Sequence, residues 1–356
     1  MRIDRQNNFD LIRLFAALQV LLVHAGHHLG LDSAPWRVLA SALDCFPGVP
    51  IFFFVSGYLI SASWVHDPSL SRYAVRRFFR IYPALWVCFG LTLLLLLACG
   101  ALDGTPVETA VWVLAQLSIV QFYNPQFLRD FGVGVINGSL WTIPVELSFY
   151  VVLPVAFLLV ARIVRGAGSR SAGWLLLGLG LVLSAFTDRL AASQPDALAT
   201  RLLMVSLPPF LYMFAFGVAA FAYRERLLPL AIRVGWWTVP LYAMIAYAAA
   251  ESGIGRIGMR PDGWLFALLG LAILGAAHSR PKLSQRILRG NDISYGTYIY
   301  HMLVVNLLVT VGWPGSAASV LAVAALTLLL AWGSWRLVER PCLHLARQRF
   351  HSLREV

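Results

Sequence analysis

The chain has 356 residues, of which 59% are hydrophobic and 13% are charged, and its formal net charge is +11. This composition excludes a soluble globular domain, in which about half of the residues are apolar and about a quarter are charged. It also excludes a nucleic-acid partner, because no segment is long and polar enough to form an aqueous domain that could carry a basic binding surface. We therefore predict an all-α fold, a polytopic helical bundle whose partner is the lipid bilayer.

Ten apolar runs are long enough to cross the roughly 30 Å of hydrocarbon in a membrane. They cover residues 11–30, 46–65, 82–101, 141–162, 174–190, 202–223, 235–250, 263–279, 292–311 and 316–337. The first run is too long for the apolar core of a cleavable signal, so we expect it to be retained as a helix. An eleventh apolar segment, residues 107–122, is shorter and is followed by a polar stretch.

The distribution of basic residues decides the topology. Ten spans with both termini in the cytoplasm place 22 of the 28 Lys and Arg residues inside, whereas an additional span at 107–122 would leave 12 inside and 16 outside. The ten-span arrangement therefore fits better, and segment 107–122 is expected to be a re-entrant or interfacial piece on the outer side that packs on protein. We predict one transmembrane domain over residues 1–356, with no soluble domain appended.

The first apolar run contains two residues that are costly in a membrane, Arg13 and His24. Eleven positions of α-helix put the imidazole about 16 Å deeper than the guanidinium, near the middle of the bilayer. An ionisable residue at that depth is a functional-site hypothesis by default. His27 and His28 complete an H-x-x-H-H pattern that is similar to one histidine box of membrane di-iron enzymes, but the other histidines stand singly. We therefore expect no metal site and place His27 and His28 at the outer interface.

Four further residues are candidates for chemistry. Arg77 and Arg80 open the third span and share a helix face, where two guanidinium groups suit a polyphosphate. Glu146 lies just inside the fourth span after Pro144, and His301 lies about ten residues into the ninth span. Intramembrane groups of this kind must be paired or functional, and helix-to-helix hydrogen bonds remain the alternative for both.

At these residues the chain resembles the acyltransferase family 3 membrane proteins, which modify polysaccharides, Nod factors and macrolides. The resemblance rests on the order and spacing of short motifs. They are Phe9-Asp10-x-x-Arg13 with His24, Phe52-Phe-Phe-Val-Ser-Gly-Tyr58, Arg77-x-x-Arg80-Ile-Tyr-Pro83, Ser139-Leu-Trp141 with Glu146, Ser294-Tyr with Tyr298 and His301, and Glu339-Arg-Pro341. One departure is Pro50, where many members carry an aspartate.

The resemblance implies an integral O-acyltransferase of a bacterial plasma (inner) membrane. Its donor would be cytoplasmic acyl-CoA, in particular acetyl-CoA, and its acceptor a carbohydrate or glycolipid hydroxyl, such as that of a cell-surface polysaccharide or its lipid-linked precursor. Arg13, Arg77 and Arg80 would bind the CoA phosphates. His24, Glu146 and His301 would be the catalytic residues.

Two questions stay open at the level of the sequence. His24 could take the proton of the attacking hydroxyl, or it could attack the thioester and carry the acyl group itself. A transporter or flippase that uses His24, Glu146 and His301 as a proton relay is the rival function. Such proteins often contain internal repeats with interrupted helices, and none is evident here.

Overall fold

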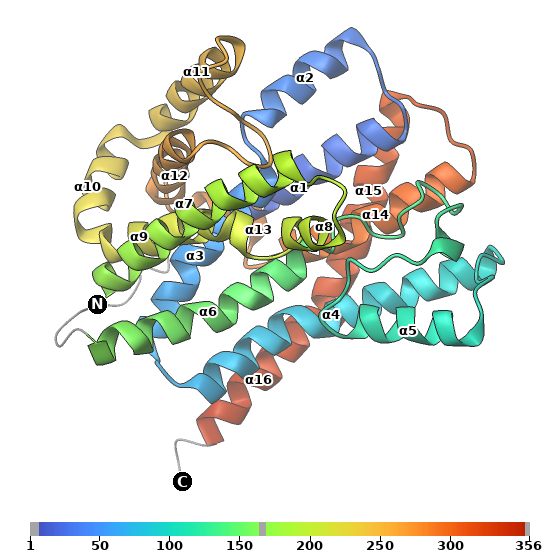
Figure 1. Cartoon of the computed structure of the whole chain (residues 1–356), viewed down its shortest axis with the longest axis horizontal. Coiled ribbons are helices and arrows are strands. Elements are labelled where there is room, and N and C mark those ends of the chain that lie inside the picture. The colour runs from blue at the N-terminus through green and yellow to red at the C-terminus, as the bar shows by residue number, and fades with distance from the viewer. Residues whose placement is uncertain (1–6, 164–168, 353–356) are drawn as a thin grey trace. The chain divides into compact units, whose positions relative to one another are not determined.

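The computed structural model describes residues 7–163 and 169–352 (Figure 1), and within these ranges it consists of helices without strands. Four of the arginines counted above as cytoplasmic, Arg2, Arg5, Arg165 and Arg354, lie outside the described residues. The prediction of an all-α polytopic membrane fold is confirmed.

The helices follow the apolar runs closely. In chain order they are α1 (Phe9–His28), α2 (Ala34–Asp44), α3 (Gly48–His66), α4 (Leu70–Ala98), α5 (Pro106–Leu117), η1 (Gln126–Leu128), α6 (Thr142–Ile163), α7 (Ser169–Ser193), α8 (Leu198–Met204), η2 (Pro208–Phe210), α9 (Leu211–Ala222), α10 (Arg224–Val234), η3 (Gly235–Trp237), α11 (Thr238–Glu251), α12 (Gly263–His278), α13 (Leu283–Leu288), α14 (Ser294–Thr310), α15 (Ala317–Ser334), η4 (Trp335–Glu339) and α16 (Arg340–Ser352).

In the described part of the chain, seven helical stretches are long and apolar enough to cross a membrane, or eight if α8 and the bent continuation through α9 count as one span. Helix α12 is apolar but shorter. Helix α5 has 12 residues and is not one of these stretches. Its rise of about 18 Å is less than the thickness of the hydrocarbon. The count of ten spans and the outer location of segment 107–122 stay predictions.

The chain forms two compact units, each discontinuous in sequence. Unit 1 contains residues 1–16, 40–68 and 145–290, and unit 2 contains residues 17–39, 69–144 and 291–356. Helices α1 and α6 each begin in one unit and end in the other. The single transmembrane domain stays a prediction.

Close backbone packing of α3 against α9 organises unit 1. A Cβ atom on Gly57 would lie 2.0 Å from the carbonyl oxygen of Phe214, and one on Gly217 would lie 2.1 Å from that of Phe54. Glycines at such contacts let membrane helices approach each other without a side chain between them. The rings of Phe53 and Phe149 both stack on Phe214, with centroids 4.4 and 4.2 Å away. This stack fixes α6 beside α3.

Unit 2 is organised around α14. An apolar cluster joins the second half of α1 to α14 and α15; its buried members are Leu21, Ala25, Leu29, Val304, Val305, Leu308, Val320 and Val323. A second cluster fastens α5 and the segment 126–136 to α4, with Trp112 and Leu128 fully buried in it. Helix α16 packs along α4 (Figure 1). Helix α14 is therefore held in place along its whole length.

Candidate active site

Two of the predicted site residues, 277 positions apart in sequence, lie side by side in unit 2. The Nδ1 atom of His24 lies 3.0 Å from Nε2 of His301, and the ring centroids are 5.2 Å apart. His301 is fully buried, whereas His24 is half-buried. The apolar cluster between α1 and α14 brings them together, because it surrounds His24 on one helix and follows His301 on the other.

The hydrogen bonds of the pair determine which nitrogen of His24 can react. Nδ1 of His301 lies 2.6 Å from the carbonyl oxygen of Tyr298, and a carbonyl can only accept, so Nδ1 of His301 is the donor. In the neutral ring Nε2 of His301 is then an acceptor, and Nδ1 of His24 donates to it. This assignment leaves the lone pair of His24 on Nε2, the atom that a base or a nucleophile needs.

The segment 137–142 supports Tyr298. The Tyr298 hydroxyl donates to the carbonyl oxygen of Ser139 at 2.9 Å and lies 2.8 Å from the Thr142 hydroxyl. The Asn137 amide donates to the carbonyl oxygen of Ile299 at 2.9 Å and accepts from the Ser139 hydroxyl at 2.7 Å. These bonds fix the turn of α14 whose carbonyl orients His301. The Ser139-Leu-Trp141 motif therefore acts on the histidine pair through the backbone.

Asn306 anchors the preceding part of the same loop to α14. Its buried amide donates to the carbonyl oxygens of Val135 and Ile136 and accepts from the backbone N–H of Val133. Gly132 meets Asn306 so closely, at a φ of +56°, that a Cβ atom there would lie 2.0 Å from the amide oxygen. These contacts hold the loop firmly against α14 within unit 2.

Arg80 of α4 forms an ion-pair cluster with carboxylates near the beginning of α14 and in η4. It is 2.6 Å from a carboxylate oxygen of Asp292 and 3.6 Å from one of Glu339, with only 14% of its side chain exposed. Its guanidinium also lies over the ring of Tyr295, 5.8 Å from the centroid. His301 is six residues beyond Tyr295, about 9 Å farther along the helix. Arg80 thus connects α4, α14 and η4 near the histidine pair.

Arg77 is half-buried one helical turn before Arg80, with its guanidinium 5.8 Å from the centroid of the Tyr73 ring. Arg13 is half-buried on α1, in the part of that helix that belongs to unit 1. His27 is exposed and His28 is half-buried. The ring of His28 lies 6.0 Å from that of His24.

Glu146 belongs to unit 1. Its Oε1 accepts hydrogen bonds from the Ser56 hydroxyl at 2.7 Å and from the Tyr150 hydroxyl at 2.6 Å. Ser56 belongs to the Phe52–Tyr58 motif of α3, so two of the sequence motifs meet at this carboxylate. The two hydroxyl donors therefore hold this carboxylate oxygen in place between α3 and α6.

Several polar residues that build these sites were not predicted. Asn306 lies in the apolar run 292–311. A polar side chain within a membrane span is usually anchored or functional, so the sequence did contain a signal for this residue. Asp292 is the first residue of the same run, where it accepts hydrogen bonds from the backbone and hydroxyl of Ser294. Asn8 precedes α1 and is fully buried. Among the described residues, no group of three or more His, Cys, Asp and Glu side chains is arranged to hold a metal ion.

Comparison with known proteins identifies relatives along nearly the whole chain. The model of the acyltransferase 3 family, described as an acyltransferase domain, matches residues 6–336. Nodulation protein 10 of Rhizobium leguminosarum bv. viciae is 34% identical over 96% of this chain and 94% of its own length. An O-acetyl transferase of Shigella phage Sf6 is 28% identical over 94% of this chain and 96% of its own.

A third relative is the peptidoglycan O-acetyltransferase OatA of Listeria monocytogenes, which is 25% identical over 83% of this chain and 51% of its own length. No solved structure matches the chain significantly.

Proposed function

This chain belongs to the acyltransferase 3 family and is a membrane acyltransferase, and from this premise we propose that it transfers an acetyl or other short acyl group from acyl-CoA to a carbohydrate hydroxyl. The donor would be used from the cytoplasm, and the enzyme would lie in a bacterial plasma membrane with both termini inside. The observation that carries the proposal is the hydrogen-bonded pair of His24 and His301.

The Nε2 lone pair of His24 starts either of two balanced reactions. As a base, it takes the proton of the acceptor hydroxyl while the oxygen attacks the thioester carbonyl; the C–S bond breaks, and the proton passes to the departing thiolate. As a nucleophile, Nε2 bonds to the acyl carbon and the C–S bond breaks to release CoA as the thiolate; the hydroxyl oxygen then attacks the acyl carbon, the C–N bond breaks, and the freed Nε2 takes up the hydroxyl proton. In both reactions His301 holds His24 in the required tautomer.

On the donor side, Arg77, Arg80 and Arg13 are the proposed phosphate-binding residues. The geometry separates their roles. Arg80 already forms ion pairs with two carboxylates, so we assign it chiefly to positioning α4 and α14, with Arg77 as the main phosphate contact. Guanidinium groups suit this task because they bind phosphate oxygens in bidentate fashion.

On the acceptor side, we propose that Glu146 is the third catalytic residue. A carboxylate held by two hydroxyls can accept a hydrogen bond from a sugar hydroxyl and orient it. A carbohydrate acceptor is supported by the relative that is named a peptidoglycan O-acetyltransferase. A cell-surface polysaccharide or its lipid-linked precursor is the acceptor we propose.

The decisive experiment compares His24→Ala with the matched control His27→Ala, which changes an exposed histidine three residues away. The purified enzymes are incubated with radiolabelled acetyl-CoA, with and without acceptor glycan from the host cell. We expect His24→Ala to lose transfer by at least about 10²-fold, while acetyl-CoA binding persists and the control stays active. Label retained on the wild-type protein without acceptor, and absent in His24→Ala, would select the acyl-histidine reaction.

The same assay tests the rival function, a transporter or flippase with a relay of His24, Glu146 and His301. Such a protein would neither bind acetyl-CoA nor transfer its acetyl group. Near wild-type transfer by His24→Ala would refute the proposed chemistry.

A further inference from the structure

A cavity separate from the histidine pair lies within unit 1, whereas the pair belongs to unit 2. It has a volume of about 560 Å³ and is lined by Trp236, Trp237, Pro240, Arg280 and Leu283. These residues come from η3, from the first turn of α11 and from the turn between α12 and α13. The cavity therefore sits where α11 begins and α12 ends.

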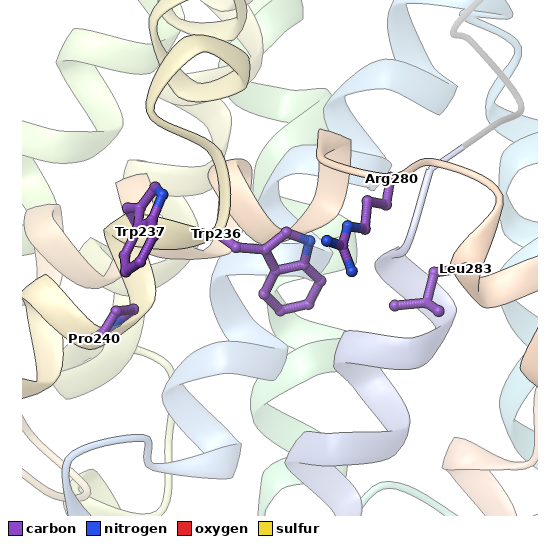
Figure 2. A pocket seen from close by; sticks show the side chains of 5 residues that line it. All are labelled: Trp236, Trp237, Pro240, Arg280 and Leu283. Atoms are coloured by element: carbon purple, nitrogen blue, oxygen red, sulfur yellow. The ribbon is translucent and has the colours of Figure 1, made fainter.

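The lining of the cavity combines one basic side chain with two indoles and two aliphatic side chains. Figure 2 shows the Arg280 guanidinium directed toward the Trp236 indole, with Trp237 and Pro240 on one side and Leu283 on the other. Trp237 is 79% exposed and Trp236 is 38% exposed. No hydrogen bond or ion pair of the Arg280 side chain is found with residues 7–163 or 169–352. A cationic group is therefore presented beside the Trp236 indole, with Trp237 on the far side of that ring.

The turn that carries Arg280 is held rigidly. Arg280 has a φ of +50°, a left-handed conformation that non-glycine residues rarely adopt without support. The support comes from Asn8, whose amide donates to the carbonyl oxygens of Ala276, Ser279 and Arg280 and accepts from the backbone N–H of Ser284. Asn8 is fully buried. Four hydrogen bonds from one side chain thus fix the backbone that aims Arg280.

The backbone conformation of Gly235 constrains the side of the cavity that Trp236 and Trp237 form. Gly235, directly before Trp236, has φ 61° and ψ −140°, which only glycine adopts readily. A Cβ atom there would lie 3.1 Å from Oγ of Ser279, the neighbour of Arg280. That hydroxyl is buried and has no hydrogen-bond partner among the described residues. The residues before Trp236 and before Arg280 are therefore in close contact at the edge of the cavity.

The charge around the cavity indicates its partner. The segments 224–237 and 279–290, which flank it, contain eight charged residues, of which seven are basic. The positive-inside rule predicts that these basic segments face the cytoplasm, and the cytoplasmic leaflet carries the anionic lipids that attract basic groups near the surface. Exposed tryptophans are typical of the same headgroup level, because the indole is apolar with one polar N–H.

We propose that this cavity binds the phosphate-bearing headgroup of an anionic phospholipid from the cytoplasmic leaflet. Arg280 holds the phosphate, and Trp236 and Trp237 pack on the glycerol and the upper acyl chains. The bound lipid fixes the α11–α12 end of unit 1 at the membrane surface. This inference concerns a site separate from the acyl-transfer residues and does not depend on their chemistry.

The test is a lipid titration of the full-length protein in detergent, followed by native mass spectrometry. Phosphatidylglycerol and phosphatidylcholine with identical acyl chains are compared. We expect the wild type to retain phosphatidylglycerol preferentially, and Arg280→Gln to lower that affinity about fivefold without changing phosphatidylcholine binding, since one Arg near an anionic surface contributes about 1 kcal/mol. Arg280→Lys should keep most of the preference.

The matched control is Arg226→Gln, which removes the same charge from an exposed position that does not line the cavity. Equal losses in Arg226→Gln and Arg280→Gln, or no lipid preference in the wild type, would overturn the proposal. If Arg280→Gln does not fold, Trp236→Leu takes its place and should weaken binding of the lipid at unchanged charge.

Acetyl-CoA binding of the same variants separates this site from the donor site. Arg280→Gln should bind acetyl-CoA as the wild type does. Loss of acetyl-CoA binding with unchanged phosphatidylglycerol binding would identify the cavity as a nucleotide site and overturn the lipid assignment.

Discussion

His301 offers the sharpest test of the histidine pair, because the proposal gives it a positioning role and no bond to substrate. Replacing it with leucine removes the acceptor 3.0 Å from Nδ1 of His24. Nothing then selects the tautomer with its lone pair on Nε2, and the reactive nitrogen is protonated in part of the molecules. A group of this kind contributes about 10²- to 10⁴-fold to acid–base catalysis, and we expect kcat to fall within that range.

The substitution also has a structural cost that must be separated from the catalytic one. His301 is fully buried, and its loss leaves the His24 N–H without the acceptor that His301 supplies. An unsatisfied buried polar group costs about 1–3 kcal/mol of stability. Thermal unfolding of the variant should therefore shift downward, while KM for acetyl-CoA changes little.

The conservative variant His301→Gln distinguishes positioning from proton transfer. The amide oxygen of glutamine can take the place of Nε2 and accept from His24, but it cannot hold a proton in exchange. We expect His301→Gln to recover at least about tenfold of the activity that His301→Leu loses, measured by acetyl transfer to the acceptor. A folded but inactive His301→Gln would mean that His301 exchanges protons itself. Wild-type activity in His301→Leu would refute the tautomer argument altogether.

Three further predictions follow from other parts of the chain. Arg80→Ala should destabilise the protein by about 3–5 kcal/mol in unfolding assays, because it removes the cation from two carboxylates that have little solvent exposure, whereas Arg77→Ala should weaken acetyl-CoA binding and leave stability nearly unchanged; the reverse pattern would contradict the assigned roles. Thr105 caps the beginning of α5. Its hydroxyl and its backbone N–H donate to Glu108 and hold the pKa of that carboxyl below the usual 4.5. Its stabilisation is present above that value and is lost as pH falls through the lower folded pKa, so acidification should lower the amide protection factors in the first turn of α5, taken relative to the intrinsic exchange rate at each pH, in the wild type and not in Glu108→Gln. For topology, a cysteine at Gln126 should react with a membrane-impermeant reagent from outside and one at Gln285 should not; labelling at the second position would refute the ten-span arrangement.

Much of the helical framework was predictable, because an apolar run of about 20 residues in lipid has to satisfy its own backbone hydrogen bonds. Each expected run coincides with a helix or a bent helix pair. The depth of His24 and of His301 was also readable from helical rise. Their contact was not, since spacing along a chain gives depth and does not say which helices are neighbours. That adjacency depends on how Leu21, Val305 and Val320 pack together.

The role of Arg80 shows a different reason for incomplete prediction. A basic cluster at the beginning of a span is expected from topology alone, and two arginines on one face suit a phosphate equally well. The sequence contained the carboxylates that pair with Arg80, but Asp292 and Glu339 lie 212 and 259 positions away. Only the packing of α4 against α14 and α16 brings them within reach. Long-range pairing, rather than residue type, decides the role.

Helix α14 explains how one unit can serve both sides of the proposed reaction. Its beginning holds Arg80 through Asp292, its middle carries His301, and Asn306 fastens the 133–136 loop five residues farther on. From Asp292 to Asn306 the chain rises about 21 Å, so the ion pairs of Arg80 and the 133–136 loop lie at opposite ends of this stretch with His301 between them. Gly296 keeps α14 close to α15, because a Cβ atom there would lie 2.9 Å from Cα of Ala331. A shift of α14 would therefore displace the ion pairs of Arg80, the His24–His301 pair and the loop together. The proposed transfer from a donor on one side of the membrane to an acceptor on the other requires these three to stay aligned.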